Sequence, residues 1–174
     1  MTMNNRDVST IHQPVLLEDC VRLVTGGLSR KQSPIIVDCT LGLAGHATAF
    51  LKAAPQAHLV GIDRDAEALA LATERMKAEG LADRFIPVHA PFDEFTRALD
   101  DNGIHHVDAA FMDLGLSSLQ IDETERGFSY SHDAPLDMRM DVTQPLTAEQ
   151  ILAEYSFADL VRIFRTYGEE RFSK

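Results

Sequence analysis

The stretch Ile35-Ile36-Val37-Asp38-Cys39-Thr40-Leu41-Gly42-Leu43-Ala44-Gly45-His46 decides the fold. It begins as an apolar, β-branched run, ends that run in the acid Asp38, and then breaks into a loop with two glycines. Such a run is typical of a buried strand that leads into a turn. Helical spacing of apolar residues over 45–54 and the stop at Pro55 predict a helix. Because Leu59–Asp63 is a second strand-like run, this part of the chain predicts a β-loop-α-β unit.

The loop and the acid at the end of the second strand predict a site for a nucleoside-like ligand. Glycines let a ligand approach the backbone, and the Asp63 carboxylate would accept hydrogen bonds from ribose hydroxyls. A dinucleotide site needs G-x-G-x-x-G, but Thr40 and Ala44 stand where further glycines are expected. A ligand without phosphates, such as S-adenosylmethionine, therefore suits the loop better. The alternative is that Gly42 and Gly45 only form a strand-to-helix turn.

The rest of the first 113 residues alternates between helical and strand patterns. We expect helices over 15–24, 66–79 and 93–100, and strands over 84–89 and 107–112. This alternation predicts a parallel, doubly wound α/β sheet, in which ligands bind at the carboxyl ends of the strands. Four side chains fall at that edge: Asp38, Asp63, Phe92 and Asp113. Phe92 would stack on an adenine ring, and the alternative is a core position beside Phe95.

The composition is that of an acidic globular protein. The 174-residue chain is 45% hydrophobic and carries a formal net charge of −11. This charge argues against a broad phosphate-binding surface but leaves room for a local basic patch. No run approaches the roughly 18 apolar residues of a membrane span, so we expect a cytoplasmic protein without membrane contact. Cys20 and Cys39 fit buried free thiols, and we expect no metal site.

The character of the chain changes after the fourth expected strand. Residues 114–120 have the composition of a loop, and residues 121–144 are rich in acids, arginines and turn formers without a strand or helix period. Thr147 and Gln150 have the spacing of a capping box, which predicts the start of a helix. A further helix begins near Ser156. A helical region therefore follows the sheet.

Six motifs carry a resemblance to one known family. In chain order they are His12-Gln-Pro-Val-Leu-Leu17, Asp38-Cys-Thr-Leu-Gly-Leu-Ala-Gly-His46, Asp113-Leu-Gly-Leu-Ser-Ser-Leu-Gln-Ile-Asp122, Arg126-Gly-Phe-Ser-Tyr130, Pro135-Leu-Asp-Met-Arg-Met-Asp141 and Tyr167-Gly-Glu-Glu170. In this order they resemble the ribosomal small-subunit methyltransferase H family. The resemblance implies an S-adenosylmethionine-dependent enzyme that methylates the exocyclic N4 of one cytidine in 16S rRNA, near the decoding centre of the small ribosomal subunit.

The resemblance also implies which residues contact the cofactor: Ala44, Gly45, His46, Asp63, Phe92, Asp113 and Gln120. It would place Asp63 on the ribose and Phe92 on the adenine. Asp113 and Gln120 would face the methionine end of the cofactor and the target base. Asp113 is the expected catalytic residue, because a carboxylate can accept a hydrogen bond from the cytosine amine.

Members of this family are longer than this chain, so the resemblance covers their N-terminal half. It implies a class I, Rossmann-like methyltransferase core with a partial parallel sheet over 1–118, and the truncated start of an inserted helical substrate-recognition domain over 119–174. Two alternatives stay open: a non-catalytic module that binds adenosylmethionine, and a nicotinamide-dependent oxidoreductase. The sequence also leaves open whether a homodimer covers the open edge of the sheet.

Overall fold

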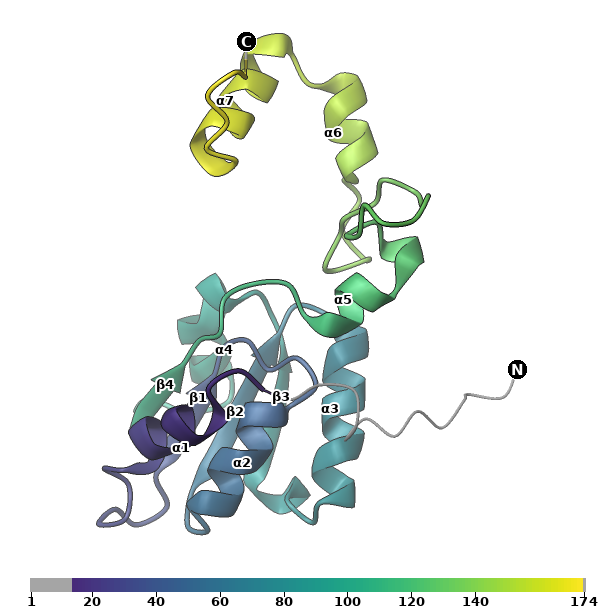
Figure 1. The fold of residues 1–174 in the computed structure, drawn as a ribbon. Helices are drawn as coiled ribbons and strands as arrows, with labels where there is room; N and C mark the ends of the chain where they lie inside the picture. Colours follow the sequence, from purple (N-terminus) through teal and green to yellow (C-terminus); the bar gives the residue numbers. More distant parts are fainter. Residues whose placement is uncertain (1–13, 174) are drawn as a thin grey trace. The chain divides into compact units, whose positions relative to one another are not determined.

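A computed structural model describes residues 14–173 of the chain (Figure 1). The chain forms two compact units, Met1–Gly115 and Leu116–Lys174. His12, for which the sequence leaves a role open, lies outside the described residues. Within residues 14–173, no helix is long and apolar enough to cross a membrane.

The first unit is built on a parallel sheet. Its strands are β1 (Ile35–Asp38), β2 (His58–Asp63), β3 (Phe85–His89) and β4 (Ala109–Phe111), in the spatial order β3-β2-β1-β4 (Figure 1). The predicted parallel α/β sheet is therefore confirmed. Because the chain adds β2 and β3 on one side of β1 and β4 on the other, the topology reverses between β1 and β4. In sheets of this kind, ligands bind outside the strand ends at such a reversal.

Helices cover both faces of this sheet. They are α1 (Leu17–Thr25), α2 (Gly45–Ala53), α3 (Ala66–Ala78) and α4 (Phe95–Asp101), with 3₁₀ turns at η2 (Ala82–Arg84) and η3 (Phe92–Glu94). Ile36 packs into a cluster with side chains of α1, α2 and α3, whereas Val37 packs into a second cluster with α4. Neighbouring strand residues point to opposite faces, so burial of both explains the continuous apolar run of β1. Cys39 is buried as expected, but the expectation for Cys20 is wrong, because its place on α1 leaves it only partly buried.

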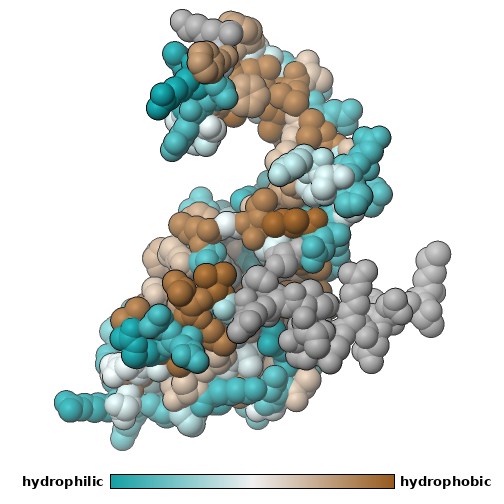
Figure 2. Space-filling model, viewed as in Figure 1, coloured by the Kyte–Doolittle hydropathy of each residue, from teal (hydrophilic) through white to brown (hydrophobic). Residues whose placement is uncertain are grey.

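The second unit contains α5 (Ser118–Asp122), η4 (Thr124–Arg126), α6 (Ala148–Glu154) and α7 (Phe157–Tyr167). The expectation of a loop throughout 114–120 is wrong at its end, because Ser117 and Gln120 form a capping box that starts α5. The capping box of Thr147 and Gln150 is confirmed. No residue of α6 or α7 is buried, and Figure 2 shows apolar side chains gathered on the surface of these two helices.

Candidate functional site

Three carboxyl groups gather where β1, β2 and β4 end. Asp38 and Asp63 are the last residues of β1 and β2, and Asp113 follows β4 after one intervening residue. Asp63 and Asp113 each lie close enough to Asp38 to act on it electrostatically. The structure thus brings these three acids together at the strand ends, beside the topological reversal between β1 and β4.

Asp38 is the most deeply buried member of this cluster, with 1% of its surface exposed. Burial, and then the nearby carboxylates of Asp63 and Asp113, raise its pKa to about 7, although a hydrogen bond from the Thr40 N–H (3.1 Å) opposes the shift. The strand pattern places Asp38 at the ligand edge of the sheet, but neither the pattern nor the resemblance assigns it a contact with the cofactor. Its position after an uninterrupted apolar run was the signal that it would be buried.

Asp63 ties the glycine loop to the end of β2. Its Oδ2 accepts a hydrogen bond from the Gly42 N–H at 2.7 Å, and its Oδ1 accepts one from the Asp65 N–H at 2.9 Å. Burial raises the pKa of Asp63 above its ordinary value. The Arg64 N–H is a third backbone donor, so one of the four lone pairs of the carboxylate remains for a further donor such as a ribose hydroxyl.

Ala44 and Gly45 form the turn into α2. Ala44 has a φ of 59°, in the left-handed region that favours glycine. Gly45 is required for a different reason, because a Cβ at this position would lie 2.6 Å from Cγ of Pro14. Packing against Pro14 therefore explains this glycine without a ligand. The first backbone N–H groups of a helix have no acceptor within it, so those of Gly45 and His46 remain suited to an anionic group.

The ring of His46 is used inside the protein. Its Nε2 lies 3.0 Å from the carbonyl oxygen of Val15, and the ring centroid lies 4.8 Å from that of Phe111 and 6.0 Å from that of Phe50. These contacts link α2 to β4 and to the segment that precedes α1. A cofactor contact by His46 would therefore be made by its backbone.

Phe92 is exposed and lies at the start of η3, directly after Pro91. Its side chain is 43% accessible, whereas Phe95 packs against the cluster on the α4 side of the sheet. The alternative of a core role for Phe92 is thus wrong. The ring is free to stack on a flat ligand, and adenine binding by Phe92 stays a prediction.

Gln120 belongs to the second unit and has a structural partner. Its Oε1 accepts a hydrogen bond from the Ser117 N–H at 3.1 Å, and Ser117 Oγ accepts one from the Gln120 N–H at 3.2 Å. The residue is 5% exposed. Its expected contact with the methionine end of a cofactor stays a prediction.

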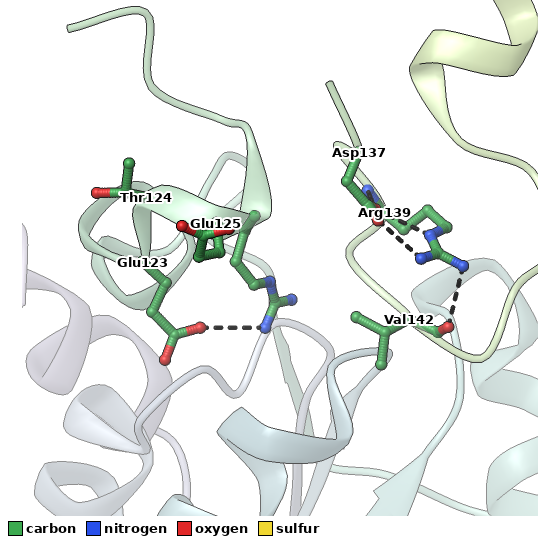
Figure 3. Close-up of a pocket in the computed structure, with 7 residues that line it drawn as sticks. Glu123, Thr124, Glu125, Asp137, Arg139 and Val142 are labelled. Atoms are coloured by element: carbon green, nitrogen blue, oxygen red, sulfur yellow. Dashed lines mark hydrogen bonds and ion pairs between the residues drawn. The ribbon is translucent and has the colours of Figure 1, made fainter. Parts of the chain in front are cut away.

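The second unit also contains a pocket of about 330 Å³ (Figure 3). It is lined by Glu123, Thr124, Glu125, Arg126, Asp137, Arg139 and Val142. Figure 3 shows Asp137 and Arg139 facing each other, and their closest nitrogen–oxygen distance is 2.7 Å. Arg126 lies 3.5 Å from Glu123 and donates to the Met140 carbonyl. The hydrogen bond from Arg126 to Met140 joins two of the sequence motifs, and the ion pairs offset the charge of both arginines.

These features are typical of a nucleoside-binding α/β protein: a parallel sheet with a glycine loop, a carboxylate at the end of its second strand and acids at its topological reversal. Comparison with known proteins narrows this class. Residues 9–174 match the model of the MraW methylase family, and the chain belongs to that family. The membership suggested by the six motifs is confirmed.

Curated relatives of this chain carry the name ribosomal RNA small subunit methyltransferase H. The protein of Bifidobacterium adolescentis is 79% identical over 168 residues, which cover 97% of this chain and 49% of that protein. The protein of Leifsonia xyli is 55% identical over 163 residues, which cover 94% of this chain and 49% of that protein. The chain thus spans about half the length of the curated relatives it matches.

Solved structures give more distant likenesses. A putative rRNA-methylase from Clostridium thermocellum matches with a TM-score of 0.46 and 17% identity, over 62% of this chain and 57% of that one. An S-adenosylmethionine-dependent O-methyltransferase from Thermotoga maritima matches with a TM-score of 0.46 and 20% identity, over 59% of this chain and 37% of that one. The family assignment does not depend on these likenesses.

Proposed function

We propose that this chain is part of an S-adenosylmethionine-dependent methyltransferase that acts on the exocyclic N4 of a cytidine in 16S rRNA near the decoding centre. Membership in a methylase family and relatives named for the small-subunit RNA support the reaction and the substrate. They also favour a cytoplasmic enzyme that meets the small ribosomal subunit. A homodimer has no support from the comparisons or from residues 14–173, so it is not part of the proposal.

The acidic cluster at the strand ends is the observation that carries the choice of cofactor. Asp63 and Asp113 both lie near enough to Asp38 to raise its pKa. S-adenosylmethionine brings a sulfonium and an ammonium group, which such carboxyl groups attract. A nicotinamide dinucleotide brings a pyrophosphate, which they repel. The geometry therefore favours adenosylmethionine over the oxidoreductase alternative.

The chain offers a group for each part of this cofactor. The remaining lone pair of Asp63 would accept a hydrogen bond from the ribose, and the exposed ring of Phe92 would stack on the adenine. The turn at Ala44 would present the first N–H groups of α2, those of Gly45 and His46, to the methionine carboxylate. The resemblance assigns Gln120 to the methionine end as well.

Asp113 is the proposed catalytic residue. Cytosine N4 is a weak nucleophile, because its lone pair is delocalised into the ring. The Asp113 carboxylate would accept a hydrogen bond from the N4 amine, which orients the nitrogen lone pair toward the methyl group of the cofactor. When the methyl group is transferred, the same carboxylate would accept the proton that leaves N4. Asp113 is exposed at the end of the sheet, so a base from RNA can reach it. We propose that Leu116–Lys174 begins an inserted domain that recognises this RNA.

Transfer of labelled methyl groups from S-adenosylmethionine to small ribosomal subunits tests the proposal. We expect Asp113→Ala to lower the rate by at least about 100-fold, because the amine loses its acceptor, while the variant still binds the cofactor. Asp83→Ala is the matched control, since it removes an exposed acid at the other end of β3. Turnover by Asp113→Ala at the wild-type rate would remove the catalytic assignment. Cofactor binding without transfer by the wild-type chain would instead favour the non-catalytic module.

A further inference from the structure

One hydroxyl group fastens the segment after β4 to β1. The last backbone hydrogen bond between these strands runs from the Cys39 N–H to the Phe111 carbonyl, at 3.0 Å. Beyond it the Asp113 N–H donates to Oγ1 of Thr40, at 2.7 Å. The Thr40 side chain thus replaces the backbone acceptor at the point where the sheet ends. It extends the link between the two strands on either side of the topological reversal.

The same residue also binds the buried acid. The Thr40 N–H donates to Asp38 Oδ1 at 3.1 Å, and the Thr40 side chain is near enough to lower the pKa of that carboxyl group. Through its N–H and its hydroxyl, Thr40 therefore links a fixed group in the core to the backbone of the exposed acid.

Burial does little to hold the segment that carries Asp113. Met112 and Leu114 on either side are 44% and 66% exposed, and Gly115 follows them. A segment with few buried contacts keeps its position through its hydrogen bonds. At Asp113 the backbone N–H makes such a hydrogen bond, to Thr40 Oγ1 at 2.7 Å.

We propose that Thr40 is a positioning residue: its N–H binds the buried Asp38, its hydroxyl binds the backbone N–H of Asp113, and this link sets where the Asp113 carboxylate lies at the end of the sheet. The consequence for catalysis rests on the proposed function, which gives that carboxylate the target amine. The structural link itself does not depend on any ligand, so the two parts can be tested separately.

Amide hydrogen exchange followed by NMR tests the link in the free chain. Thr40→Val keeps the shape of the side chain without the hydroxyl, and Thr40→Ser keeps the hydroxyl. We expect the Asp113 amide to exchange at least about 10-fold faster in Thr40→Val than in the wild type and in Thr40→Ser. The Cys39 amide is the internal control for an intact sheet. If Thr40→Val loses Cys39 protection, Thr40→Ala replaces it. Equal Asp113 exchange in all folded variants would overturn the proposal.

A double-mutant cycle on methyl transfer tests the consequence. If Thr40 acts through Asp113, Thr40→Val slows transfer in the wild-type background but has no further effect on Asp113→Ala, and Thr40→Ser restores the rate. Equal losses in both backgrounds would show a general structural role and overturn the positioning role. A wild-type chain that transfers no methyl group would contradict the proposed function, while the exchange measurement would still decide the link.

Discussion

Asp38 is a carboxyl group that the fold almost completely removes from water, and this couples stability to pH. Its pKa is about 7 in the folded protein, because of burial first and of the carboxylates of Asp63 and Asp113 after it, against an ordinary value of 3.8. Between these two values the unfolded chain has released the proton that the folded chain still holds. The contribution of Asp38 to stability therefore falls as the pH rises through this window, and is constant above it.

Asp38→Asn should remove the loss of stability that comes from burying an ionised carboxylate. Asparagine carries no charge and can still accept a hydrogen bond from the Thr40 N–H. We expect the variant to be more stable than the wild type at about pH 8, by on the order of 2 kcal/mol, with the difference shrinking toward about pH 4. Urea denaturation of both proteins across this range measures it. Asp83→Asn, at an exposed acid, is the control. A stability difference that does not change with pH would show that Asp38 does not titrate as described.

The sequence was a good guide to the positions of individual acids in the fold, and a poor guide to the contacts of individual side chains. Asp38 and Asp63 end apolar runs, and a parallel sheet brings such ends together, so their meeting follows from the pattern. The contacts of His46 do not, because its Val15 and Phe111 partners come from parts of the chain that only the packed fold brings near. From the sequence, Gly45 is expected to leave room for a ligand. The structure shows another reason for this glycine: a Cβ at this position would collide with the side chain of Pro14.

Arg84 joins η2 to the end of α2. Its guanidinium donates to the carbonyl oxygens of Leu51, Ala54 and Ala57, at distances of 3.1 to 3.2 Å. Carbonyls at the end of a helix have no partner within the helix, and a cation is favourable there. The arginine therefore supplies hydrogen-bond donors to the carbonyl groups at the end of α2 and to one in the segment that leads into β2.

Arg84→Met should destabilise the first unit by about 2–3 kcal/mol, because methionine keeps the apolar part of the side chain but leaves these carbonyls without their donor. Arg97→Met is the matched control: Arg97 forms exposed ion pairs with Glu94 and Asp101, and we expect its loss to cost less than about 1 kcal/mol. Thermal denaturation compares the two variants. Equal effects would contradict the structural role of Arg84.

Helices and strands were predictable where a local signal exists. The capping box of Thr147 and Gln150 was recognised, but the same spacing in Ser117 and Gln120 was not, and α5 was missed. The fourth strand was expected over 107–112 but forms only over Ala109–Phe111, because it pairs with three residues of β1. Strand ends depend on the partner strand, which a single segment does not reveal.

The order of the strands could not be predicted from the sequence. Alternating helices and strands predict parallel pairing, but the position of β4 beside β1 depends on how the third crossover runs. That position creates the topological reversal flanked by Asp38 and Asp113. The alternating pattern ends soon after β4, and within residues 14–173 the buried apolar side chains all lie in Leu28–Leu99, inside the first compact unit. The domain bounds 1–118 and 119–174 stay a prediction.

Calorimetric titration of the 174-residue chain with S-adenosylmethionine tests the central claim most directly. We predict saturable binding, at least about 10-fold weaker in Asp63→Ala, because the ribose loses its acceptor and the Gly42 N–H its partner. Asp83→Ala should bind as the wild type does, and NAD should not bind. A folded wild-type chain that binds NAD but not S-adenosylmethionine, or that binds S-adenosylmethionine equally well after Asp63→Ala, would contradict the site described at the end of this sheet.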